Sequence, residues 1–317
     1  MFRRFSIPTP FAVGPVNAYL AGRTLVDPGP GSEEAWSALL EALEEQNLGA
    51  ADVEQVLVTH PHPDHFGLAK RLREEGARVV ASPGTAGVIR DFAARLEFEQ
   101  DFFVDFFEHH GMARSTAETV ADLPEAYLSV SPGVETDLEL GDGESVEVDG
   151  TALTAEAVDG HATGETIFTY EDGGASGALV GDHVLPHITP NPLLQPPRED
   201  AAERPRVLPA FNRSLEELRE REFDRFLPGH GDVIDAPTDR IDEILAAHEE
   251  RTENVVELLD GPTTAFDVME GLFGDLPATE QFPGMSEAIG HLDVLEERGE
   301  VTNREQGGVY VYEGVEA

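Results

Sequence analysis

The sequence predicts an α/β fold, with a layered main domain over residues 1–235 and a small C-terminal domain over residues 236–317. In the first part, short apolar runs bounded by glycine and proline alternate with longer amphipathic stretches, as strands alternate with helices in layered α/β domains. In the second part, three helical stretches precede two short β-like runs around Gly307-Gly308, which is the order of a winged helix.

The first elements follow from turn and capping residues. Two apolar runs, Asn17 to Leu20 and Thr24 to Val26, predict strands because a turn rich in glycine and proline follows them. Ser32 is predicted to cap a helix that ends near Gln46, since a serine hydroxyl accepts hydrogen bonds from the first helical turn. The alternation continues with a strand at Gln55 to Thr59, a helix at Phe66 to Glu75 and a strand at Arg78 to Ala81.

Residues 85–140 form a predicted insert that is helical in character and rich in aromatic residues. Two interpretations stay open and are compatible: a pair of packed helices, or a lid over a pocket, because aromatic side chains commonly line substrate sites. His109 and His110 in this insert are candidates for substrate contacts.

Strands return after the insert, and helices follow them. Five prolines between Pro186 and Pro197 predict an irregular loop, because proline lacks the N–H that helices and sheets require. The predicted strands are Glu144 to Val148, Leu153 to Ala157, Thr166 to Tyr170 and Ala178 to Val180; the predicted C-terminal elements are helices at Arg240 to Leu259, Thr264 to Phe273 and Ser286 to Arg298, and strands at Val301 to Asn303 and Val309 to Tyr312.

The charge of the chain is far from average, with 63 acidic against 21 basic residues and a net charge of −42. Lys70 is the only lysine, and the acidic residues are spread over the whole chain. This pattern is typical of proteins from salt-loving microbes, where high ionic strength screens self-repulsion. The chain has no cysteine, no signal-peptide pattern and no stretch that could span a membrane, so we expect a cytoplasmic protein without disulfides.

The C-terminal domain is a poor candidate for binding nucleic acid. From Arg251 onward it has 3 basic against 15 acidic residues, whereas a nucleic-acid surface needs lysine and arginine to neutralise phosphates. We expect this domain to brace the main domain or to form a homodimer, and we expect the partner of the chain to be a small-molecule substrate.

Four side chains of the metal-ligand type lie within six residues, directly after the predicted strand that ends at Thr59: His60, His62, Asp64 and His65. Burying several imidazoles and a carboxylate without partners is costly, which disfavours a purely structural role. Histidine and aspartate suit zinc, with iron or manganese as alternatives. Pro61 and Pro63 predict that the segment is a rigid loop rather than a helix.

The motif His60-Pro61-His62-Pro63-Asp64-His65 resembles the signature of the metallo-β-lactamase superfamily. The resemblance implies a four-layer αββα sandwich over residues 1–235 and two divalent metal ions at the sheet edges. It also implies three further ligands, which match His161 in Asp-Gly-His-Ala-Thr-Gly, Asp182 in Leu-Val-Gly-Asp, and His230 in Pro-Gly-His-Gly.

The ligand assignment that the resemblance implies divides the residues into two sets. His60, His62 and His161 would hold one metal, and Asp182 would bridge both. The second metal would be held by Asp64, His65 and His230, and Asp64 could also orient a metal-bound hydroxide. Four other histidines receive lesser roles: His183 and His187 near the site as supporting or substrate-contacting groups, His248 as a solvated residue and His291 as a structural one.

Among the branches of that superfamily, the chain is most similar to the lactamase-beta-like 2 type with a C-terminal winged helix. Its ligand set is also that of glyoxalase II-type thioesterases, but the residues after Asp182 depart from their pattern. The absence of cysteine disfavours the common zinc β-lactamase site. The resemblance therefore implies hydrolysis of an ester, thioester or lactone-like bond, with an endoribonuclease or phosphodiesterase acting on single-stranded RNA as the alternative.

Overall fold

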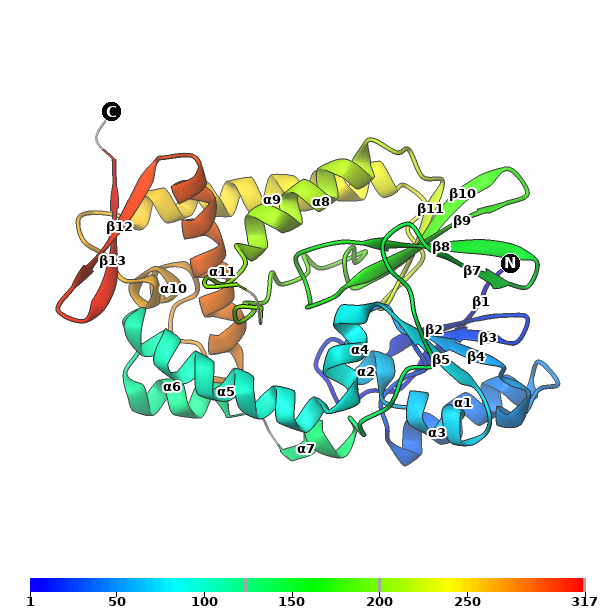
Figure 1. Cartoon of the computed structure of the whole chain (residues 1–317). Coiled ribbons are helices and arrows are strands. Elements are labelled where there is room, and N and C mark those ends of the chain that lie inside the picture. The colour runs from blue at the N-terminus through cyan, green and yellow to red at the C-terminus, as the bar shows by residue number, and fades with distance from the viewer. Residues whose placement is uncertain (123–124, 199–200, 316–317) are drawn as a thin grey trace. The chain divides into compact units, whose positions relative to one another are not determined.

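The computed structural model describes residues 1–122, 125–198 and 201–315 (Figure 1). The chain forms two compact units, each assembled from three stretches. The first comprises residues 1–94, 124–190 and 217–241, and the second comprises residues 95–123, 191–216 and 242–317. These units do not follow the predicted boundary at residues 235 and 236, and the predicted division into a catalytic and a winged-helix domain stays a prediction.

The first unit contains a six-stranded sheet with the order β1-β2-β3-β4-β5-β6. The strands β1 to β3 are antiparallel, and β3 to β6 run parallel to one another. Parallel neighbours place their carboxyl ends at one edge of a sheet, so the loops that follow β3, β4 and β5 meet there. The strands are β1 (Arg3–Ile7), β2 (Val16–Ala21), β3 (Thr24–Val26), β4 (Gln55–Leu57), β5 (Arg78–Ala81) and β6 (Leu138–Glu139).

A second sheet of the same unit has the order β11-β10-β9-β8-β7. Its strands are antiparallel except that β11 runs parallel to β10. The strands are β7 (Ser145–Val148), β8 (Thr151–Ala157), β9 (Thr166–Asp172), β10 (Ala175–Gly181) and β11 (Arg225–Pro228).

Two hydrophobic clusters hold the layers of the first unit together. One lies between the two sheets and includes Leu57 and Val80 from the first sheet and Phe168 and Leu179 from the second. The other joins the first sheet to the helices that cover its opposite face (Figure 1). These helices are α1 (Glu33–Glu44), α2 (Pro63–Phe66), α3 (Ala69–Glu74) and α4 (Pro83–Arg90); the short helices η1 (Ala50–Asp52) and α7 (Glu125–Ser129) also belong to this unit.

The second unit is mainly helical and ends in a hairpin. Its core joins the aromatic segment of residues 95–122 to the C-terminal helices, as Phe103 and Phe107 share one cluster with Met269, Met285 and Ile289. The elements with residues in this unit are α5 (Phe92–His109), α6 (Arg114–Ala121), α8 (Val207–Arg219), α9 (Pro237–Leu258), α10 (Ala265–Phe273), α11 (Ala278–Glu297), β12 (Val301–Gln306) and β13 (Val309–Gly314).

Most predicted elements are present with shifts of a few residues at their ends, and the predicted mixed α/β class is confirmed. Ser32 caps α1 by accepting a hydrogen bond from the Ala35 N–H at 3.1 Å, as predicted. The helix predicted from Ser286 instead begins at Ala278 and contains Pro283, although proline removes a hydrogen bond inside a helix. Prediction missed β1, β6, β11 and α8.

The aromatic insert forms packed helices, as one of its two interpretations predicts, and the structure leaves its role as a lid untested. Among the described residues, none of the helices combines the length and the apolar character of a membrane span.

Candidate metal centre

The structure brings all seven predicted ligand residues together within the first unit. They come from the loops that follow strands of both sheets, where β4, β8, β10 and β11 end. The two sheets share one core, so these strand ends meet at one edge of the sandwich. The residues are His60, His62, Asp64, His65, His161, Asp182 and His230.

One group consists of His60, His62, His161 and Asp182. Nδ1 of His62 lies 3.1 Å from Nε2 of His60 and 3.1 Å from Nε2 of His161. Nε2 of His161 lies 3.7 Å from Oδ2 of Asp182. Three imidazole nitrogens and one carboxylate oxygen therefore converge on one point, which suits a divalent metal ion with tetrahedral coordination.

The second group consists of Asp64, His65 and His230. Nε2 of His230 lies 3.3 Å from Oδ2 of Asp64 and 3.5 Å from Oδ2 of Asp182. Nε2 of His65 lies 3.5 Å from Oδ1 of Asp182. The carboxylate of Asp182 thus lies beside both groups: Oδ1 is near His65, and Oδ2 is near His161 and His230.

The backbone that presents Asp64 and His65 corrects one prediction. The segment was predicted to be a rigid loop, but Pro63 begins the short helix α2 and both residues lie on it. Proline is favoured at the first helical position because its N–H would be unpaired there in any case. The helix places Asp64 and His65 beside His230, the third member of the second group.

A glycine makes room for this arrangement. A Cβ atom on Gly229 would lie 2.3 Å from Oδ1 of Asp182 and 2.6 Å from Cε1 of His65. Both are shorter than van der Waals contacts, so any larger residue would displace one side chain. Position 229 therefore requires glycine for steric reasons.

The electrostatics of the cluster favour the neutral form of His60 and His62 and the ionised form of Asp182. Burial, assisted by neighbouring imidazoles, lowers the pKa of His60 and brings that of His62 to about 3. Burial opposes ionisation of Asp182, yet the adjacent His65 and His230 hold the pKa of Asp182 well below its usual range. His65 is also buried, but the surrounding carboxylates of Asp182, Asp27 and Asp64 raise its pKa. Neutral imidazole and carboxylate are the forms that bind metal.

Several buried atoms at the centre lie close to one another but make no hydrogen bond. Within the described ranges, Nε2 of His65, Oδ1 of Asp182 and Nε2 of His230 have no hydrogen bond. Buried polar atoms in native proteins are normally paired, so these atoms are available to a further group between them. A divalent cation fits, because each of the three atoms can donate a lone pair to it once His65 and His230 are neutral.

Sequence reasoning missed Asp27, which is buried directly after β3. Its Oδ1 accepts a hydrogen bond from the Thr59 N–H at 2.9 Å, and its Oδ2 accepts one from the Thr59 hydroxyl at 2.7 Å. Oδ2 also lies 2.9 Å from Nδ1 of His65. Asp27 has a φ of 51°, a left-handed conformation that is uncommon outside glycine. Its place in a Gly- and Pro-rich turn was a signal for a turn, not for a role at the site.

Two further groups near the centre were also missed. Glu165, which is 1% exposed, accepts hydrogen bonds from the His161 N–H and from the ring of His183. Tyr127 is half-buried, its ring packs edge-on against Phe11 with centroids 5.0 Å apart, and burial together with the charge of Asp64 raises its pKa. The phenol therefore stays neutral in the electrostatic field of the second group.

The remaining histidines divide between buried and exposed positions. His183 is buried beside Asp182, whereas His187 is exposed. In the second unit, His110 is buried and its Nδ1 lies 2.7 Å from the Phe106 carbonyl oxygen of its own helix. His291 is fully buried, as expected for a structural residue.

His248 corrects a prediction. It was expected to be solvated but is 1% exposed, with Nδ1 2.7 Å from Oδ1 of Asn212. The helix α9 looks polar in sequence, yet one of its faces is covered within the second unit, and His248 lies on that face.

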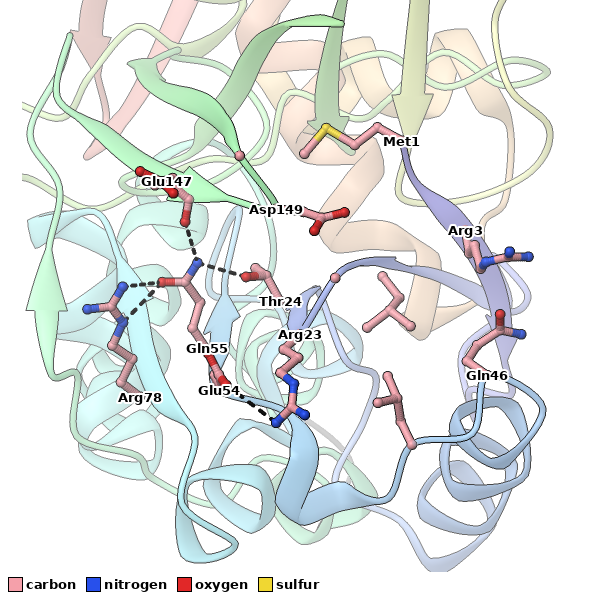
Figure 2. Close-up of a pocket in the computed structure, with 14 residues that line it drawn as sticks. Met1, Arg3, Arg23, Thr24, Gln46, Glu54, Gln55, Arg78, Glu147 and Asp149 are labelled. Carbon is pink, nitrogen blue, oxygen red and sulfur yellow. Dashed lines mark hydrogen bonds and ion pairs between the residues drawn. The ribbon is translucent and has the colours of Figure 1, made fainter.

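A polar pocket at the other end of the first sheet is distinct from the metal centre (Figure 2). It includes Thr24, Gln55 and Arg78, which are the first residues of β3, β4 and β5, whereas the predicted ligands follow the last residues of strands. Gln55 accepts two hydrogen bonds from Arg78 and donates one to Thr24 (Figure 2). None of the seven predicted ligands lines this pocket.

Comparison with known proteins places this centre in a family. A model of the metallo-beta-lactamase superfamily matches residues 12–230, a range that contains every predicted ligand. The chain belongs to the metallo-beta-lactamase superfamily. It is 32% identical over 313 residues to the "probable metallo-hydrolase YqjP" of Bacillus subtilis, covering 96% of this chain and 95% of that protein. Membership and this relative support a metal-dependent hydrolase.

Further relatives agree on the fold. The "Beta-lactamase-like protein 2 homolog" of Caenorhabditis elegans is 25% identical over 277 residues, covering 85% of this chain and 75% of that protein. A metallo-beta-lactamase family protein from Thermus thermophilus superposes with a TM-score of 0.80 at 31% identity, covering 99% of this chain and 98% of that chain. A beta-lactamase domain protein from Burkholderia ambifaria superposes with a TM-score of 0.78 at 24% identity, covering 99% of this chain and 92% of that chain. The superfamily fold predicted from the sequence is confirmed.

Proposed function

We propose that this member of the metallo-beta-lactamase superfamily is a two-metal hydrolase that cleaves an ester, thioester or lactone-like bond. The observation that carries the proposal is the position of Asp182 between two groups of three further ligands, with Oδ1 toward His65 and Oδ2 toward His161 and His230. Two divalent ions, when bound, would lower the pKa of a shared water and polarise the bond to be cleaved.

Each residue of the centre has a role in this proposal. His60, His62 and His161 hold the first ion through their imidazole nitrogens, and burial lowers the pKa of His60 and His62. The second ion is held by Asp64, His65 and His230, and Asp182 contributes to both. Asp27 fixes the orientation of His65 through its Nδ1, leaving Nε2 for the metal.

Tyr127 is the candidate for a substrate contact. Its ring is held by Phe11, and its hydroxyl lies in the field of Asp64 in the neutral form, so it can donate a hydrogen bond to a substrate oxygen. Within the part of the chain that is described, this hydroxyl has no hydrogen-bond partner that would compete.

We propose zinc as the native metal, with iron and manganese as alternatives, since the donors are imidazole nitrogens and carboxylate oxygens with no thiolate. A neutral or small anionic substrate suits the chain better than RNA, because a net charge of −42 repels a polyanion unless salt screens it. We also propose that the protein is cytoplasmic and works in a saline environment. We further propose that α9 to β13 form a winged helix and that the chain forms a homodimer.

The proposal is tested by elemental analysis of the purified chain, paired with hydrolysis assays in molar salt on an acyl thioester, an aryl ester, a lactone and a single-stranded RNA. Two metal equivalents per chain with turnover of any of the acyl substrates support it. Cleavage of RNA alone, with two metals bound, would assign the centre to the phosphodiesterase alternative. A folded chain that takes up no divalent metal even when zinc is supplied would refute the two-metal centre itself.

A further inference from the structure

The end of the loop between β8 and β9 carries a buried carboxylate that does not belong to either ligand group. Glu165 is 1% exposed, and its Oε2 lies 3.2 Å from the His161 N–H nitrogen and 3.1 Å from Nδ1 of His183. One oxygen atom therefore accepts from a predicted ligand and from the neighbour of another, since His183 follows Asp182 directly.

The backbone around Glu165 restricts where this oxygen can lie. The carbonyl oxygen of Glu165 accepts a hydrogen bond from the Val158 N–H at 3.2 Å, closing the loop that presents His161. The next residue, Thr166, donates its N–H to the Thr59 carbonyl oxygen at 2.9 Å, immediately before His60. The backbone at Glu165 is thus bonded to residues that follow β8 and β4. Its side chain contacts His183, which follows β10.

The neighbourhood of His183 is equally restricted. Its N–H donates to the Val180 carbonyl oxygen at 3.0 Å, and the side chain is fully buried. Because residues 182 and 183 are consecutive, contacts that hold His183 also restrain the backbone next to Asp182. Glu165 supplies an acceptor that faces Nδ1 of this ring at 3.1 Å.

We propose that Glu165 is a positioning residue that sets the distance between His161 and Asp182 by accepting hydrogen bonds from both loops on a single oxygen. This inference rests on the proposed function, because it takes His161 and Asp182 as ligands. It adds a residue to which no metal contact is assigned. The relevant property is the position of Oε2, and the negative charge is secondary.

Two substitutions separate position from charge. Glu165→Gln keeps an acceptor oxygen at the same reach and removes the charge, whereas Glu165→Asp keeps the charge and withdraws the oxygens by one methylene. Glu156→Ala is a structural control from β8, because Glu156 accepts a hydrogen bond from the Thr169 hydroxyl at 2.7 Å and pairs with Arg221, and neither of these residues is a predicted ligand.

The test is a calorimetric titration of the full chain, freed of metal with a chelator, with Co²⁺ in molar salt, followed by the visible absorption of the bound Co²⁺. We expect Glu165→Asp to weaken binding at the first group by about tenfold or more and to shift the absorption bands, as removing partners of metal ligands does elsewhere. Glu165→Gln should stay within about threefold of the unaltered chain with unchanged bands. Glu156→Ala should lower the melting temperature and leave the bands unchanged.

Two outcomes would overturn the inference: Co²⁺ binding and bands in Glu165→Asp that match the unaltered chain, or a Glu165→Gln variant as weak as Glu165→Asp. The proposed function fails separately, since in that case the unaltered chain itself would bind no Co²⁺.

Discussion

Asp27 Oδ2 lies 2.9 Å from Nδ1 of His65, so a residue at the end of β3 determines which ring nitrogen of a helix residue faces the candidate metal centre. The same carboxylate holds the backbone and hydroxyl of Thr59, the residue before His60. Asp27 thereby links both ligand groups, and the positive φ at this residue is tolerated because three hydrogen bonds fix its side chain.

Replacing Asp27 by alanine should weaken metal binding about 10- to 100-fold, the usual effect of losing a partner of a ligand histidine. The ring of His65 would be free to turn, and the buried Thr59 N–H would lose its acceptor. Zinc titration of the metal-free chain measures the effect, and Asp27→Asn should retain part of the affinity because one amide oxygen can still accept. Wild-type affinity in Asp27→Ala would show that His65 is oriented by other contacts.

Replacing Asp182 by alanine should abolish binding of a metal pair and reduce turnover by at least about a thousandfold, because the Asp182 oxygens lie 3.5 Å from His65 and His230 and 3.7 Å from His161. Elemental analysis would then give at most one metal per chain. The circular dichroism spectrum serves as the control for folding. Retention of two metals and activity would contradict the bridging role.

Replacing Gly229 by alanine should prevent metal binding without removing any ligand, because the new Cβ would overlap Oδ1 of Asp182. The matched control is Gly87→Ala in α4, where a Cβ meets nothing within 4 Å and alanine favours the helix. Gly229→Ala should have a lower metal content than the unaltered chain. Gly87→Ala should keep its metal content and have an equal or higher melting temperature. Normal metal content in Gly229→Ala would mean that the strand end can move aside.

The second unit should lose stability on acidification through His248. Burial lowers its pKa from 6.5 to about 4, so the folded unit binds fewer protons than the unfolded chain between these values. Stability is therefore present above pH 6.5 and declines as the pH falls toward 4, by roughly 3 kcal/mol at most.

Denaturant titrations at pH 7 and pH 4.5 in constant molar salt would measure this dependence. His248→Gln should show a smaller fall than the unaltered chain, since glutamine does not titrate. An identical fall in both chains would assign the acid sensitivity to other groups, such as His110 and His291, whose pKa values are also lowered by burial.

The sequence alone predicted three of the four strands that the ligands follow, and it missed β11, which precedes His230. The crowding of His60, His62, Asp64 and His65 pointed to four of the seven candidate ligands, and the resemblance to the superfamily supplied the other three. This was feasible because strands such as Arg78–Ala81 are short apolar runs between clear breakers, and because His60 to His65 are crowded within one turn. Helix ends were less predictable near proline, because proline occurs both in loops and at the first position of helices. Pro63 begins a helix, although a proline in sequence equally suggests a loop.

Only the tertiary structure decided which residues support the ligands and which surfaces are buried. Asp27 and Glu165 are single acidic residues among 63, and nothing in the sequence distinguishes them until strand ends distant in the chain are brought together. Likewise, His248 lies on a helix whose letters are mostly polar, and its burial depends on packing within the second unit. Local patterns determine strands, helices and ligand types, whereas orientation and burial depend on contacts between distant segments, which no local pattern encodes.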